Sequence, residues 1–183
     1  SSELDMTLLP ISDGGEGLLE SLEHSLALSG VTPYIFSCTG PYGSKVDAGL
    51  LVLEEKTAFI EMAQCCGLEL VQREHRRVEN ASTYGLGEMV KHALDMGCSR
   101  IVIGIGGSAT NDGGAGFAQA LGALFYDKNS QLIEAPICGK DLINIAKINF
   151  DKFDSRAAKV EFNVSCDVEN PLLGNNGATY IYG

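Results

Sequence analysis

Two turns of this chain share an Asp-Gly-Gly tripeptide, one at Asp13 and the other at Asp112, and each turn leads into a predicted helix. A carboxylate at such a point can accept a proton from a hydroxyl group or hold Mg²⁺, which prefers oxygen ligands. Asp167 is a third acid, at the end of a predicted strand. Because ligands of open α/β sheets bind where strands end and helices begin, the three acids are candidate site residues. Either tripeptide could instead supply a helix N-cap, a role that involves no chemistry.

The second turn belongs to the stretch 101–117, IVIGIGGSATNDGGAGF, in which a short apolar run precedes glycines and small polar residues. The run 101–105 is β-branched and apolar throughout, which is typical of a strand covered on both faces of a parallel sheet. Glycine lets a ligand approach the backbone closely, and the free N–H groups of a helix start favour an anion. We therefore expect these turns to bind a phosphate or carboxylate group. The candidate binding residues are Gly14, Gly15, Glu16, Gly106, Gly107, Ser108, Thr110, Asn111, Gly113 and Gly114.

A different interpretation fits the same glycines. Gly104, Gly106 and Ala109 satisfy the pattern G-x-G-x-x-A, and Asp127 follows about twenty residues later, where a dinucleotide-binding site places a ribose-binding acid. This spacing allows an oxidoreductase that uses a nicotinamide cofactor. Against it, polar side chains occupy the part of the turn where the helix of that motif packs on its sheet. A non-catalytic module that binds a small anion is a third possibility.

The elements that must position these residues alternate between strand and helix, with one run of consecutive strands. Turn residues around 40–43 and 54–56 separate three short strands, which indicates an antiparallel meander. The pattern predicts an α/β fold with a mixed sheet. Glu61 lies inside an otherwise apolar strand, where it either faces water or belongs to the site, and 141–149 is ambiguous. The predicted strands are 6–11, 34–38, 48–53, 57–62, 101–105, 123–126 and 160–165, and the predicted helices include 18–28 and 84–96.

Composition narrows the class of protein. The chain has 183 residues, 45% of them hydrophobic, and a formal net charge of −11, which argues against nucleic acid or an anionic membrane surface as a partner. No stretch approaches the length of a membrane span and the N-terminus does not resemble a signal peptide, so we expect a cytoplasmic protein. The six cysteines form no C-x-x-C pair, which favours reduced core residues over zinc ligands or disulfides.

Six runs of residues resemble the type I glycerate kinases, the bacterial glycerate 2-kinases, in the order that this family shows. They are LPISDGGEG, TGPYG, FIEMA, ASTYGLGE, IGIGGSATNDGGAG and CDVENPL. The resemblance covers nearly the whole chain. It implies transfer of the γ-phosphoryl group of ATP to a hydroxyl of D-glycerate, with Mg²⁺, on a two-domain α/β fold that has a Rossmann-like part.

Phosphoryl transfer asks a protein mainly for positioning and charge neutralisation, and on that basis we expect the following roles for the acids. Asp13 or Asp112 would orient or deprotonate the attacking hydroxyl, and the remaining acid would hold Mg²⁺ with Asp167. Replacing Asp112 by Asn should then lower turnover far more than stability. Family members are about twice as long, with a PDSFKG segment earlier and a GPQKG run later. We therefore expect residues 1–32 to be part of an incomplete Rossmann-like domain, 33–183 to form a second α/β domain, and the chain alone to be inactive.

Overall fold

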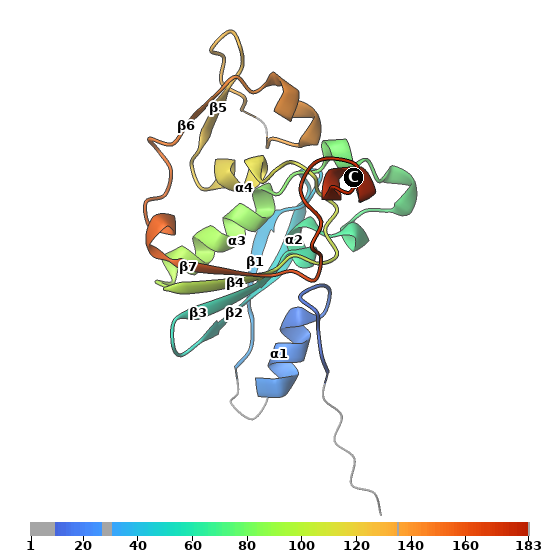
Figure 1. The fold of residues 1–183 in the computed structure, drawn as a ribbon. Helices are drawn as coiled ribbons and strands as arrows, with labels where there is room; N and C mark the ends of the chain where they lie inside the picture. The colour runs from blue at the N-terminus through green and yellow to red at the C-terminus, as the bar shows by residue number, and fades with distance from the viewer. Residues whose placement is uncertain (1–9, 27–30, 135, 183) are drawn as a thin grey trace, which may run out of the picture.

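The computed structural model describes residues 10–26, 31–134 and 136–182, and it shows an α/β fold with a mixed sheet, as predicted (Figure 1). Three strands follow one another in an antiparallel meander. The third then pairs in parallel with a fourth strand, which pairs in parallel with a fifth. The five strands lie in the order β1 (Tyr34–Thr39), β2 (Lys45–Leu53), β3 (Thr57–Glu61), β4 (Arg100–Gly104) and β7 (Glu161–Ser165).

The register of the parallel strands brings their carboxyl ends into one row. Glu61 at the end of β3 lies opposite Gly104 at the end of β4, and Gly104 lies opposite Ser165 at the end of β7. Segments far apart in the sequence therefore leave the sheet side by side. This row is the edge from which the glycine-rich turn after β4 begins, so the fold places that turn where ligands of α/β sheets bind.

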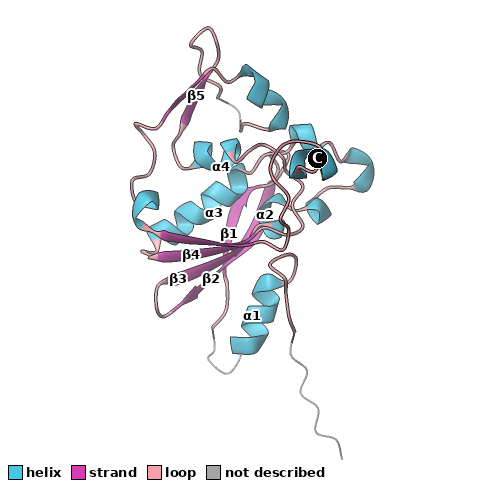
Figure 2. Cartoon of the chain, viewed as in Figure 1, coloured by secondary structure: helices cyan, strands magenta, loops and turns pink. Residues whose placement is uncertain are grey.

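Helices cover both faces of the sheet (Figures 1 and 2). Helix α1 (Leu18–Leu26) contacts β2 and β3 on one face, where Leu19 is buried. On the other face lie α2 (Ala63–Cys66), α3 (Tyr84–Asp95) and α4 (Ala115–Ala120), and α3 contacts the first three strands as well as α4. The spacing of the apolar side chains on α3 is that of an amphipathic helix. The helix ends at Asp95 and is followed by Gly97, whose φ of +74° prevents it from continuing.

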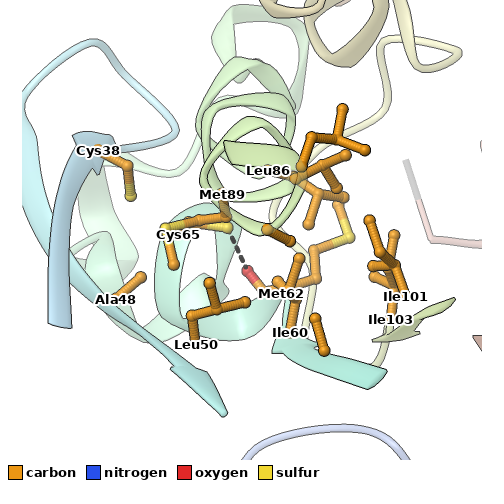
Figure 3. Packing of buried hydrophobic residues seen from close by; sticks show 14 of the residues in the cluster. Cys38, Ala48, Leu50, Ile60, Met62, Cys65, Leu86, Met89, Ile101 and Ile103 are labelled. Carbon is orange, nitrogen blue, oxygen red and sulfur yellow. Dashed lines mark hydrogen bonds between the residues drawn. The ribbon is translucent and has the colours of Figure 1, made fainter. Parts of the chain in front are cut away.

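The main core lies between the sheet and α3 (Figure 3). Met89 of α3 packs with side chains of the strands below it, and Cys65 of α2 points into the same layer, where its thiol donates to the Met62 carbonyl oxygen at 3.4 Å. All six cysteines are free and all but Cys166 are buried, as expected for reduced core residues. The strand residues of this layer include Ala48, Leu50, Ile60, Ile101 and Ile103.

A smaller unit lies beside α4. Strands β5 (Leu124–Tyr126) and β6 (Lys147–Asn149) form a separate antiparallel sheet, and Phe125 and Ile137 pack under it. The ambiguous segment 141–149 resolves into the end of the 3-10 helix η5 (Gly139–Asn144), followed by β6. The remaining short helices are η2 (Leu68–Leu70), η3 (Arg73–His75), η4 (Val78–Asn80), η6 (Ala157–Lys159) and α5 (Ala178–Ile181).

Most predicted elements are confirmed within a few residues, although β2 begins at Lys45 rather than at residue 48. Most of the strand predicted at 6–11 and the predicted end of the first helix near 28 lie outside the described residues, while residues 10 and 11 have no regular structure. The division at residue 32 stays a prediction. Among the described helices, none combines the length and the apolar character that a membrane crossing requires.

Candidate functional site

The two glycine-rich turns lie against each other at the carboxyl edge of the parallel strands. The N–H of Gly106, just after β4, donates to the carbonyl oxygen of Gly14 at 3.2 Å. Gly14 also packs on Ser165 at the end of β7, so closely that a side chain at Gly14 would meet the serine hydroxyl. The turn 12–17, the turn 106–114 and the segment that follows β7 therefore share one edge.

This contact between turns explains several of the glycines. A Cβ atom at Gly104 would overlap the carbonyl oxygen of Gly14, and one at Gly106 would overlap Gly15. Because the backbones touch, no side chain fits between them. Part of the glycine pattern in the sequence therefore reflects the packing of one turn on another, rather than room for a ligand.

Asp13 is exposed, and its carboxylate is only partly used by the protein. Its Oδ1 accepts a hydrogen bond from the N–H of Gly15 at 3.0 Å, and the Ser12 hydroxyl accepts one from the N–H of Gly14 at 3.2 Å. Among the described residues, no donor contacts its other oxygen. The turn thus fixes the carboxylate while leaving an oxygen free for a substrate hydroxyl or a cation.

Glu61 anchors the turn that carries Asp13. Its side chain is 4% exposed, and its two carboxylate oxygens accept hydrogen bonds from the N–H groups of Gly17, at 3.0 Å, and Leu19, at 3.1 Å. The Gln64 amide donates to the same carboxylate at 3.2 Å and accepts from the N–H of Gly49 at 2.8 Å. Glu61 neither faces water nor lies free in the site, because it caps the start of α1 and ties it to the sheet.

The turn 106–114 leaves some of its main-chain donors free. Within the described part of the chain, we find no acceptor for the N–H groups of Gly107, Ser108, Asn111 and Gly113. Other amides are paired: that of Ala109 donates to the Cys66 carbonyl oxygen at 2.8 Å, and that of Thr110 to the Ser108 hydroxyl at 3.1 Å. The four free N–H groups form the candidate anion cradle, which has fewer free donors than the sequence pattern indicated.

Glu16 places a negative charge beside this cradle. A Cβ atom at Gly107, whose φ is +69°, would lie 2.7 Å from the Glu16 Oε1 atom, so the carboxylate lies directly over the glycine. A bound anion would be repelled at this distance unless Glu16 turned away or a cation lay between them. The arrangement favours an anion that arrives together with a metal ion.

Asp112 is in a different environment from Asp13. It is 1% exposed, and its carboxylate accepts hydrogen bonds from the Thr83 N–H at 2.8 Å, the Thr83 hydroxyl at 2.8 Å, the Gly114 N–H at 2.9 Å and the Gly116 N–H at 3.2 Å. The Thr83 hydroxyl in turn accepts from the Phe117 N–H at 2.9 Å. Asp112 thereby joins the turn to the starts of α3 and α4.

Asp167 is exposed two residues beyond the end of β7. It lies at the same edge as Asp13, since the neighbour of Asp13, Gly14, packs on Ser165. Over the described ranges, no three acidic, histidine or cysteine side chains come together as a metal site. Mg²⁺ in nucleotide sites is commonly held by one or two carboxylates together with phosphate and water oxygens. Exposed carboxylates at one edge, with free oxygens, fit that pattern.

The dinucleotide-binding interpretation does not agree with the structure. Asp127 follows β5, which pairs with β6 in the small sheet rather than with β4. Its carboxylate accepts from the N–H groups of Asn129 and Gln131, each at 2.8 Å, and so holds a hairpin turn. Moreover, Gly106 packs against the other turn instead of facing a pyrophosphate. The spacing of Asp127 from the glycines matches the dinucleotide-binding motif, but the sheet topology places Asp127 away from β4.

A cavity of about 310 Å³ opens beside Asn111 and Gly113. Besides the turn 106–114, its walls come from η4, η5 and the segment after β7. Sequence reasoning placed the segment after β7 near the site, through Asp167, but not η4 or η5. Leu172 belongs to the run CDVENPL, but no motif marks the residues of η4 and η5, which only folding brings to this place. Cys138 precedes η5, and its thiol donates a hydrogen bond to the Asp141 carboxylate at 3.0 Å. Burial is the larger cause and the contact with Asp141 the second, and together they raise the pKa of the Cys138 thiol to about 11. The lining includes Asn111, Lys140, Leu142, Leu172, Leu173 and Thr179.

The chain is similar to known proteins both in sequence and in structure. The family model described as the glycerate kinase family matches residues 1–183. A glycerate kinase of Halalkalibacterium halodurans is 45% identical over 177 residues, which cover 96% of this chain and 45% of that protein. A glycerate 2-kinase of Escherichia coli strain K12 is 44% identical, with the same shares covered.

A solved structure is also similar. A crystal structure described as a glycerate kinase 2 from Salmonella typhimurium LT2 superposes with a TM-score of 0.86 at 41% sequence identity, over 95% of this chain and 46% of that one. The chain thus spans about half the length of the relatives that it matches.

Proposed function

The chain belongs to the glycerate kinase family, and on that premise we propose that the complete protein carrying these residues transfers the γ-phosphoryl group of ATP to D-glycerate. The observation that carries the proposal is the edge where Asp13 and the free amides of the turn 106–114 meet. Phosphoryl transfer asks a protein mainly to position the reactants and to neutralise charge. An exposed carboxylate beside main-chain donors supplies both.

Asp13 is the acid that we assign to the attacking hydroxyl. Its free oxygen accepts the hydroxyl proton as the glycerate oxygen forms a bond to the γ-phosphorus. The bond from that phosphorus to the oxygen bridging the β-phosphorus breaks, and ADP leaves. The name of the E. coli relative, a glycerate 2-kinase, supports the 2-hydroxyl as the acceptor.

The turn 106–114 binds the anionic groups. The free N–H groups of Gly107, Ser108, Asn111 and Gly113 donate to phosphate or carboxylate oxygens, and the hydroxyls of Ser108 and Thr110, 2.9 Å apart, lie in the same turn. The remaining glycines, Gly14, Gly15, Gly106 and Gly114, shape the backbone of the two turns.

Asp167 is the residue that we assign to Mg²⁺, with Glu16 as a second oxygen donor. When bound, Mg²⁺ neutralises the phosphate charge that the nearby carboxylates would otherwise repel. Asp112 takes a different part, since hydrogen bonds from Thr83, Gly114 and Gly116 already occupy its carboxylate. It positions the turn and does not touch the substrate.

The test is ADP release by the complete protein with Mg-ATP, measured with and without D-glycerate. We expect release that depends on D-glycerate, and a product whose phosphorus signal is split by one proton, as in 2-phosphoglycerate. The Asp13→Asn variant should lose about 100-fold in kcat, which is the lower end of general base catalysis, with an unchanged Tm.

Asp47→Asn, on an exposed position of β2, is the matched control and should keep the parent kcat. Release of ADP that is the same without D-glycerate would contradict the proposal. Binding of ATP with no transfer at all would point to an anion-binding module instead.

A further inference from the structure

The cavity beside Asn111 and Gly113 has walls unlike those of a site for a small anion. Val78, Leu142, Leu172 and Leu173 present aliphatic surface to it. Leu142 is 37% exposed, Leu172 58% and Leu173 71%, although side chains of this kind are normally buried. Apolar surface held open around a cavity marks a place for a ligand with an apolar body.

The size of the cavity limits the kind of ligand that it could bind. Pockets for organic ligands begin at about 300 Å³, and this one measures about 310 Å³. D-Glycerate has three carbons and is polar on every side, so it would leave most of this volume empty and the leucines unpaired. A purine nucleoside has a flat apolar ring and a size that matches the volume.

The polar groups of the lining are few and lie where a nucleotide would need them. Lys140 is the one basic side chain among the described lining residues, and its Nζ donates to the Asn80 Oδ1 atom at 2.9 Å. Asn111 and Gly113 line the cavity and also belong to the turn 106–114, where their N–H groups are free. The cavity is therefore continuous with the anion cradle.

The segment after β7 is fixed to the turn and closes this side of the cavity. The Thr179 hydroxyl donates to the Asn111 Oδ1 atom at 3.2 Å, and the Ala178 N–H donates to the Pro171 carbonyl oxygen at 2.7 Å. Figure 1 shows this segment crossing over the loops that carry η4 and the turn. These contacts hold the segment that carries Leu172 and Leu173 at the cavity, which Leu142 also lines.

From these observations we propose that the cavity binds the nucleoside half of the nucleotide, with its phosphates extending past Lys140 to the turn 106–114. This rests on the proposed kinase function and deepens it by dividing the edge into two parts. The aliphatic cavity takes the base and ribose, and D-glycerate binds on the Asp13 side of the turn. Glu79 also lines the cavity and supplies an acceptor for ribose hydroxyls.

The first test separates the two substrates by kinetics in the complete protein. Leu142→Ala removes one wall of the cavity, so we expect the KM for Mg-ATP to rise roughly tenfold while the KM for D-glycerate stays unchanged. Ile143→Ala is the matched control, because Ile143 is on the same 3-10 helix but is 91% exposed and does not line the cavity. A rise in the KM for D-glycerate alone would overturn the assignment.

The second test measures binding directly and does not depend on turnover. Calorimetry with adenosine and with ADP should show both weakened by Leu142→Ala, whereas Lys140→Met should weaken ADP roughly tenfold and leave adenosine unchanged. Lys128→Met, in an exposed hairpin, is the control. If ADP and adenosine bind equally well to Leu142→Ala and to the parent protein, the cavity is not the nucleoside site, even where D-glycerate is phosphorylated. If they bind as expected but no transfer occurs, the site stands and the proposed function fails.

Discussion

Asp13 and Asp112 occur in the same tripeptide, but the residues around them give them different chemistry. Asp13 is exposed and receives one hydrogen bond from its own turn, whereas Asp112 is 1% exposed and is surrounded by donors from two helices. A carboxylate saturated by protein donors has no lone pair to offer a substrate. The sequence suggested equal roles because it shows the turn and not what packs against it.

The Asp112→Asn variant tests this distinction. An Asn side chain keeps one acceptor oxygen and places an NH₂ group where the other oxygen accepted hydrogen bonds from Thr83 and Gly116. We expect the free energy of unfolding to fall by about 2 to 3 kcal/mol, because buried donors lose their partner. Turnover should fall as well, through displacement of the turn. Urea unfolding with Asp47→Asn as the control measures the stability effect.

This expectation differs from the one that the sequence alone supported, namely a large loss of turnover with little loss of stability. A variant that loses kcat by 100-fold at unchanged unfolding free energy would restore Asp112 as a residue acting on the substrate. Near-normal stability and near-normal kcat together would remove it from the site altogether.

At the scale of elements, one buried carboxylate holds the start of α1, in addition to the packing of Leu19 on the sheet. Glu61 receives the N–H groups at the start of the helix and is braced by Gln64, which also contacts β2 through Gly49. Since the turn with Asp13 directly precedes α1, whatever fixes the helix start also fixes the carboxylate that we propose as the catalytic base. Glu61 is thus a positioning residue that acts through the turn.

We expect Glu61→Gln to loosen the helix start without unfolding the sheet. The neutral amide keeps one acceptor, loses the charge that favours a helix N-terminus, and should cost about 1 to 2 kcal/mol locally. Amide hydrogen exchange should become faster over residues 17–26 and stay unchanged in β3 and β4. Glu20→Gln, exposed in the first turn of α1, is the control. Equal exchange in the two variants would show that Glu61 does not anchor the helix.

At the scale of the whole molecule, the edge that carries the site was predictable, but its full lining was not. The apolar run before Gly106 and the aspartates before paired glycines both point to strand ends, and a general rule of α/β sheets places ligands there. The meander, α3 and β4 follow from local periodicity and turn residues. These features depend on neighbours in the sequence.

What the sequence could not show depends on contacts between distant segments. The pairing of β5 with β6 removes Asp127 from the site, and the register of β3 with β4 brings Glu61 to the turn with Asp13. Leu142 and Lys140 reach the cavity from the short helix η5 and Leu173 from an irregular segment, and no periodic pattern in the sequence marks them. Only the folded chain shows that some glycines lie where the two turns pack against each other, whereas others have N–H groups without an acceptor among the described residues.

The central claim is that free main-chain amides at the carboxyl edge bind the anionic groups of the substrates. Amide chemical shifts of the ¹⁵N-labelled complete protein, recorded with and without Mg-ATP and D-glycerate, test it most directly. The free amides of Gly107, Ser108, Asn111 and Gly113 should move further than the paired amides of Gly106, Ala109, Thr110 and Gly114. Equal movement in the two groups, or none in either while other parts of the chain respond, would contradict the claim.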